Sequence, residues 1–159
     1  MFKQILNYKE ILDLSIKRAN LRETFSASKL SRVSEMLNDS VDGELNVVGV
    51  DCLFIQNEAL LPALKGNIDL NLDLSCQRCL GRLSWINRIS FYIEFVDMHL
   101  EEINYHSQID KIEIDDNGIS IEKIIEDEIL SIIPMSIMHK SVELCENNDT
   151  VGMFLTTSS

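Results

Sequence analysis

The sequence has few prolines, few aromatic residues and few positive charges. It contains 2 prolines in 159 residues, and aromatic residues make up 6% of the chain. Hydrophobic residues make up 45%, a share typical of chains that fold around an apolar core, so intrinsic disorder is not expected. A chain of this length buries enough apolar surface to fold without disulfide bonds.

Long hydrophobic runs are also absent. The first twenty residues, MFKQILNYKEILDLSIKRAN, intersperse charged side chains among the apolar ones, so they do not resemble a signal peptide. No later run is long enough to cross a membrane. We therefore expect a cytoplasmic protein with no membrane partner, in which thiols stay reduced.

The sequence shows no internal repeat, no low-complexity tract and no linker rich in proline, glycine or serine. These absences predict a single domain over residues 1–159, with a flexible C-terminal tail from about residue 146. The oligomeric state is not indicated by the sequence.

Positive charges are outnumbered, with 14 Lys and Arg against 26 Asp and Glu, for a net charge of −12. Residues 93–128 alone carry a net charge of −10. Affinity for nucleic acid depends on Lys and Arg that neutralise phosphates, so this segment should repel RNA and attract a basic protein. The alternative interpretation is a solvated acidic surface without a partner.

The hydropathy pattern predicts an α+β fold built mainly on an antiparallel sheet, which could close into a barrel. Residues 67–75, NIDLNLDLS, alternate strictly between polar and apolar side chains, as expected for a strand with one buried face. Residues 44–55 and 82–96 also predict strands, with a bulge or weak point at Gly49. A turn or short hairpin is expected over residues 55–67.

Two helices are predicted. Residues 26–37 form a short N-terminal helix capped by Ser26 or Ser28. A second helix near residues 120–133 begins at Ser120 and ends at Pro134. Its apolar stripe consists of Ile121, Ile124, Ile125, Ile129, Ile132 and Ile133. The carboxylates of Glu122, Glu126 and Asp127 are expected to lie off that stripe.

A CxxC pair, Cys76 and Cys79, separates two predicted strands and should therefore lie at the tip of an antiparallel hairpin. Such a pair supplies half of a structural zinc site. The other two ligands would be His139 and Cys145, whose spacing is looser than is usual for zinc. The alternative is a pair of small buried thiols at a turn.

Catalysis receives little support from the sequence, and we expect no enzymatic activity. Redox-active CxxC pairs lie at a helix N-terminus, whereas strands flank this pair. No G-x-S-x-G, H-E-x-x-H or phosphate-binding glycine loop is present. Consecutive acids such as Glu126, Asp127 and Glu128 are more often a solvated helix face than an acid–base pair.

The segment LSCQRCLGRL, followed by IEKIIEDEILSIIPMSIMHKSVELC, resembles the YceD family of large ribosomal RNA subunit accumulation proteins. The likeness covers about residues 20–146. The positions that match the family's motifs are Cys76, Gln77, Arg78, Cys79, Glu126, Asp127, Glu128, Pro134, His139 and Cys145.

The resemblance implies a non-enzymatic factor that supports the accumulation or assembly of large-subunit ribosomal RNA. Combined with the charge pattern, it suggests a basic large-subunit ribosomal protein, a large-subunit rRNA precursor, or both as partners. The candidate binding residues are Gln77, Arg78, Arg82, Glu126, Asp127 and Glu128. Direct RNA contacts would use these hairpin arginines and Arg88, or the N-terminal cations Lys17, Arg18, Arg22, Lys29 and Arg32. The alternatives are a zinc-stabilised interaction module unrelated to ribosomes and a CxxC thiol-redox protein.

Overall fold

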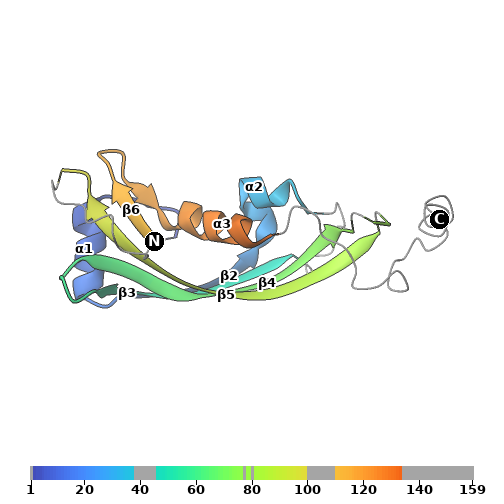
Figure 1. Ribbon diagram of the computed structural model, residues 1–159, viewed down its shortest axis with the longest axis horizontal. Coiled ribbons are helices and arrows are strands. Elements are labelled where there is room, and N and C mark those ends of the chain that lie inside the picture. The colour runs from blue at the N-terminus through green and yellow to red at the C-terminus, as the bar shows by residue number, and fades with distance from the viewer. Residues whose placement is uncertain (1, 38–45, 77, 80, 100–109, 134–159) are drawn as a thin grey trace, which may run out of the picture.

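A computed structural model describes residues 2–37, 46–76, 78–79, 81–99 and 110–133 (Figure 1). Its main sheet has five strands in the order β2-β3-β4-β5-β6. The strands are β2 (Asn20–Ser26), β3 (Val47–Gln56), β4 (Pro62–Ser75), β5 (Arg82–Asp97) and β6 (Asp110–Ile114). All neighbouring strands are antiparallel except β5 and β6, which are parallel. The α+β prediction is confirmed, and in the described part of the chain the sheet stays open rather than closing into a barrel.

The remaining elements form a second layer. Two short strands, β1 (Ile5–Leu6) and β7 (Ile119–Ser120), pair with each other. The helices are α1 (Tyr8–Ile16), α2 (Ser31–Ser34) and α3 (Ile121–Ile132), with a 3₁₀ turn η1 (Ala27–Lys29) before α2. Figure 1 shows α2 and α3 on one face of the sheet, and α1 packs against β3, β4 and β5. No helix in the described ranges is long and apolar enough to cross a membrane.

Strands β4 and β5 are the longest elements, with 14 and 16 residues. The alternation seen in the sequence holds: Ile68, Leu70, Leu72 and Leu74 are all buried. The predicted turn over 55–67 is too long, because Pro62 through Gly66 already belong to β4. No bulge interrupts β3 at Gly49, which pairs in regular register with Thr24 and Asp69.

Helix α3 follows the predicted pattern. The Ser120 hydroxyl accepts a hydrogen bond from the Lys123 backbone N–H at 3.1 Å and caps the helix. Five of the six stripe isoleucines are buried, and Ile132 is partly buried against the core. The short N-terminal helix is also found, as η1 and α2, with the Ser26 side chain at the cap of η1.

Helix α1 was not predicted. The Asn7 side chain accepts a hydrogen bond from the Glu10 N–H at 2.8 Å, and the Glu10 carboxylate accepts one from the Asn7 N–H at 3.2 Å. This reciprocal capping box satisfies two backbone donors that the first helical turn leaves without partners. Ile11, which is fully buried, anchors the helix on the sheet.

Candidate functional site

The CxxC pair lies at the turn of the β4–β5 hairpin, as predicted. Ser75 pairs with Arg82, and the Cys76 N–H donates to the Gly81 carbonyl at 2.9 Å, which closes the turn. The side chains of Cys76 and Cys79 are 0% and 2% exposed and belong to the apolar core. The hairpin geometry therefore directs both thiols to the inner face of the sheet.

The other hairpin candidates differ in exposure. Arg78 is half-buried rather than extended into solvent. Arg82 is exposed, and its guanidinium lies 3.7 Å from the buried carboxylate of Asp73. The side chain of Gln77 lies outside the described residues.

The predicted second half of the zinc site, His139 and Cys145, also lies outside the described residues, as does the tail from residue 146. Among the described residues, no group of three or more His, Cys, Asp or Glu side chains is placed to hold a metal ion. Cys76 and Cys79 would supply two thiolate ligands, which is too few for a structural zinc site without a second pair.

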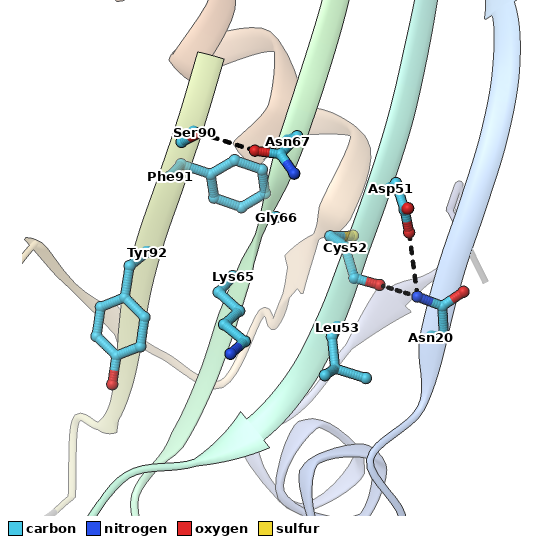
Figure 2. Close-up of a pocket in the computed structure, with 10 residues that line it drawn as sticks. All are labelled: Asn20, Asp51, Cys52, Leu53, Lys65, Gly66, Asn67, Ser90, Phe91 and Tyr92. Atoms are coloured by element: carbon cyan, nitrogen blue, oxygen red, sulfur yellow. Dashed lines mark hydrogen bonds between the residues drawn. The ribbon is translucent and has the colours of Figure 1, made fainter. Parts of the chain in front are cut away.

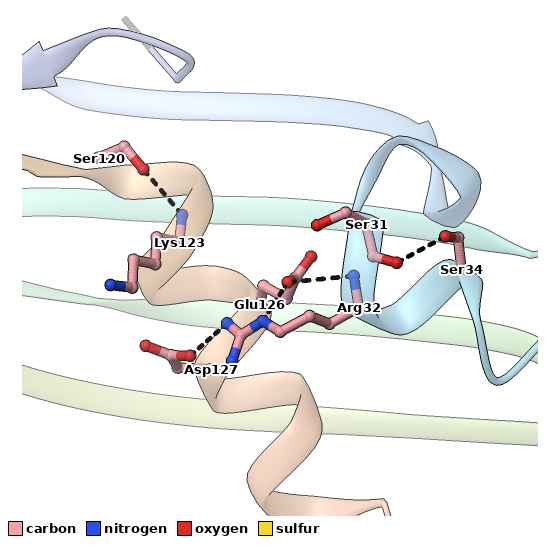
Figure 3. A network of polar contacts seen from close by, with 7 residues as sticks. All are labelled: Ser31, Arg32, Ser34, Ser120, Lys123, Glu126 and Asp127. Atoms are coloured by element: carbon pink, nitrogen blue, oxygen red, sulfur yellow. Dashed lines mark hydrogen bonds and ion pairs between the residues drawn. The ribbon is translucent and has the colours of Figure 1, made fainter.

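The three acidic residues of α3, Glu126, Asp127 and Glu128, have different surroundings. Figure 3 shows Glu126 and Asp127 beside Arg32. Glu126 is only 6% exposed, so the expectation that it lies off the buried face is wrong. Arg32 of α2 donates from Nε to the Glu126 carboxylate at 2.6 Å, and its other end contacts Asp127. The neighbouring carboxylates raise the pKa of Arg32, mainly through the hydrogen bond with Asp127. Glu126 and Asp127 thus hold α2 against α3, and Asp127 stays exposed.

Glu128 belongs to a different surface. It is half-buried, and burial raises the pKa of its carboxyl, with a further contribution from nearby Asp110 and Asp127. Exposed carboxylates continue from there along β6 and the turn after it, at Asp110, Glu113, Asp115 and Asp116. We call these four residues the acidic edge.

One end of the acidic edge contacts a histidine. His99 Nε2 lies 2.9 Å from the Asp116 carboxylate, and this contact raises the pKa of His99, with a smaller contribution from Asp97. Because the folded-state pKa is raised, the pair stabilises the fold below the unfolded pKa of histidine, and this contribution is lost as pH rises through the folded pKa.

We expect Asp116→Asn to lower the pKa of His99 toward its ordinary value. The measurement is an NMR titration of the His99 ring protons in the wild type and the variant. Glu113→Gln, which removes a nearby charge of the same sign without touching His99, is the control. An unchanged His99 midpoint in the Asp116 variant would contradict the contact.

A hollow of about 400 Å³ lies over strands β2 to β5 and was not foreseen from the sequence (Figure 2). The Asn20 amide donates to Asp51 at 3.2 Å and to the Cys52 carbonyl at 3.0 Å, and Ser90 donates to Asn67 at 2.7 Å. Burial raises the pKa of Cys52 to about 12, so its thiol stays protonated at neutral pH. The hollow therefore presents the Asp51 carboxylate, the Lys65 ammonium group, amides and hydroxyls rather than a thiolate nucleophile. Only the register of four strands brings these side chains together, and no sequence motif marks them.

No protein-family model, curated protein or solved structure matches this chain.

Proposed function

We propose that this protein is a non-enzymatic factor in ribosome biogenesis, which supports the accumulation or assembly of large-subunit ribosomal RNA by binding a basic ribosomal protein. The ribosomal context comes from the resemblance of the CQRC hairpin and the EDEI helix to the YceD family. The choice of a protein partner comes from the distribution of charge over the folded chain.

Four of the arginines considered for RNA contacts lie beside carboxylates. Arg22 pairs with Asp51 at 2.9 Å, and Arg88 lies 3.6 Å from Asp69. Arg82 and Arg32 lie beside Asp73 and Glu126, as described above. Each pair has little net charge to offer a phosphate, which argues against a strong RNA-binding surface.

The acidic edge carries the proposal. Within the part of the chain that the structure describes, Asp110, Glu113 and Asp115 are exposed and form no ion pair. Burial is the main cause of the raised pKa of Glu128, and the negative charge of nearby Asp110, a member of the acidic edge, adds to it. Lysine and arginine side chains of a partner would relieve that repulsion and would accelerate association at low salt.

Neutralising the acidic edge should weaken the complex with the basic ribosomal protein. For Asp110→Asn combined with Glu113→Gln, we expect an affinity lower by about tenfold at low salt and a smaller salt dependence, because two surface charges are removed. The measurement is a pull-down from cell extract to identify the ribosomal protein, followed by binding titrations at several salt concentrations.

The control is Glu35→Gln, which removes an exposed charge at the end of α2. If the Asp110, Glu113 double variant binds as well as this control, the acidic edge is not the binding surface. The ribosomal role itself is tested by depleting the protein and separating ribosomal particles on a sucrose gradient. Unchanged large-subunit particles and unchanged rRNA would refute the proposal.

A zinc-stabilised interaction module is the second candidate, because the hairpin turn brings Cys76 and Cys79 to the same buried face. His139 and Cys145 would complete the ligand set, and the metal would stabilise the fold. Metal analysis of the purified protein tests this candidate. Stoichiometric zinc that disappears in the Cys76→Ser, Cys79→Ser variant supports it, whereas a metal-free wild type excludes it.

A further inference from the structure

Strand β2 forms one edge of the five-stranded sheet, and its outward side has no neighbouring strand in the described part of the chain. The strand at the opposite side of the sheet is β6, which belongs to the acidic edge. Strand β2 has seven residues, contains no proline and pairs with β3 in regular register without a bulge. Proline and bulges are usual devices that prevent an edge strand from pairing with another chain, and β2 has neither.

The hydrogen bonds at the two ends of β2 show which backbone groups face outward. The Ala27 N–H donates to the Asn46 carbonyl at 2.7 Å, and the Phe54 N–H donates to the Ala19 carbonyl at 2.9 Å. Hydrogen-bonded and non-hydrogen-bonded pairs alternate along an antiparallel ladder, so the odd-numbered residues of β2 bond to β3. The even-numbered residues therefore direct their N–H and C=O groups away from β3.

Arg22 and Thr24 are the even-numbered residues in the middle of β2. Both are exposed, and neither forms a backbone hydrogen bond with another residue in the described ranges. Each offers one N–H donor and one C=O acceptor at the open side of the strand. An extended segment of another chain can pair with such groups and extend the sheet.

A hollow of about 240 Å³ lies beside the same strand. Its lining comes from β2, the N-terminal segment, η1 and α3, namely Phe2, Lys3, Glu23, Phe25, Lys29 and Glu122. None of these residues belongs to β3, so the hollow lies on the open side of β2. The ring centroids of Phe2 and Phe25 are 4.9 Å apart and form its apolar part. A strand added to β2 would direct every second side chain toward this hollow.

Glu23 indicates the chemistry of the partner. It is half-buried and forms no ion pair within the described residues. Because its backbone bonds to β3, Glu23 would occupy a non-hydrogen-bonded position relative to an added strand, where opposite side chains come closest. Opposite charges stabilise such a cross-strand pair, and like charges destabilise it. The hollow as a whole is neutral, so the position opposite Glu23, rather than the net charge, favours a Lys or Arg of the partner.

The same charges argue against a second copy of the chain as the partner. In the register that pairs all seven residues of β2 with a second β2, Glu23 lies opposite Glu23. A slide by two residues in one direction places Arg22 opposite Arg22, and a slide in the other direction leaves only Arg22 to Ser26 paired. Self-pairing is therefore either shortened or opposed by like charges.

We propose that β2 is a docking edge for an extended segment of another protein. The segment adds antiparallel to β2 as a sixth strand, with a Lys or Arg opposite Glu23 and an apolar residue opposite Phe25. The proposal goes beyond the ribosomal function and does not depend on it.

Hydrogen exchange of the full-length chain, followed residue by residue with NMR, tests whether the edge is open. In the protein alone, we expect the N–H groups of Arg22 and Thr24 to exchange quickly, whereas those of Glu23 and Phe25 are protected by β3. Slow exchange of Arg22 and Thr24 would overturn the proposal. At every protein concentration it would show that the chain itself covers the edge, and at high concentration alone that a second copy does.

The binding probe is the acetylated and amidated heptapeptide Thr-Val-Thr-Lys-Thr-Val-Thr, added in excess. We expect it to protect the N–H groups of Arg22 and Thr24. Replacing the lysine of the peptide with glutamate should weaken binding by about fivefold, and this preference should reverse in the Glu23→Lys variant. Absence of protection by the lysine peptide, or equal binding of the two peptides to the wild type, would refute the docking edge.

Backbone methylation of the peptide provides matched controls. N-methylation of the two threonines next to the lysine removes the donors that face Arg22 and Thr24, so it should abolish binding. N-methylation of the lysine, whose N–H faces away from β2, should leave binding intact. Thr24→Pro removes an outward donor of β2 without removing a bond to β3, and should also abolish binding. If this variant does not fold, the two methylated peptides decide, and equal binding of both overturns the proposal.

Discussion

Replacing Gly66 with alanine is expected to destabilise the protein by about 3 kcal/mol, the upper end of the usual cost of overpacking. Gly66 lies in β4 between Cys52 of β3 and Phe91 of β5. A Cβ atom at this position would lie 2.4 Å from the Asp51 carbonyl oxygen and 2.6 Å from the Cys52 Cα. Both are backbone atoms, so the strands themselves must move apart to admit a methyl group. Urea unfolding of the wild type and the variant measures the loss.

Gly49 provides the control in the neighbouring strand. A Cβ atom there would meet the Asp69 Cβ at 3.8 Å and the Thr24 Oγ1 at 3.9 Å, which are ordinary contacts. Gly49→Ala should therefore change the free energy of unfolding by less than about 1 kcal/mol, in the stabilising direction, because alanine restricts the unfolded chain more than glycine does. Equal effects at Gly49 and Gly66 would show that strand spacing is not the cause.

Replacing Asn46 with alanine is expected to cost about 2–4 kcal/mol, because two contributions are lost together. Asn46 has a φ of 67°, a left-handed conformation that asparagine tolerates better than alanine. Its side chain accepts a hydrogen bond from the Asp73 N–H at 2.7 Å, and its carbonyl accepts one from the Ala27 N–H at 2.7 Å. The residue thus joins β4 to the start of η1, and it is itself buried.

Asn46→Gly separates the two contributions. Glycine adopts the left-handed conformation without strain but has no side chain to accept the Asp73 N–H. Its free energy of unfolding should fall between those of the wild type and Asn46→Ala, with the gap to alanine about 1 kcal/mol. Thermal or urea unfolding of the three proteins gives these differences. An alanine variant as stable as the glycine variant would mean that the backbone conformation costs nothing.

The parts of the fold that were predictable from the sequence are those set by neighbouring residues. Alternation fixed the buried face of β4 from Ile68 to Leu74, and the isoleucine stripe identified α3. Helix α1 was missed, although Asn7 and Glu10 have the capping-box spacing that marks a helix start. The turn predicted over residues 55–67 was found between Gln56 and Pro62 but was predicted too long, because Gly66 lies in β4, where it permits a close approach between strands.

The site depends on contacts that no local pattern contains. Glu126 is buried because Arg32, 94 residues earlier in the chain, neutralises it. The parallel pairing of β5 with β6 brings Asp110 beside Ile93, and the position of the acidic edge follows from that pairing. A short stretch of sequence gives the charge of each residue, but it does not identify the distant residue that forms an ion pair with it. The excess negative charge over residues 93–128 was therefore predicted. The sequence did not predict that Glu126 and Asp127 pair with Arg32 while the acidic edge stays exposed.

The contact between Arg32 and Glu126 also bears on how the chain folds during synthesis. Helix α2 has only four residues, too few to persist as an isolated helix. Its ion pair is with α3, so this contact can form only after residue 126 has left the ribosome. Contacts between such distant residues slow folding, because the chain loses the entropy of closing a long loop before the contact stabilises the fold. Nascent chains that stop before α3 should therefore leave α2 unanchored and sensitive to proteases.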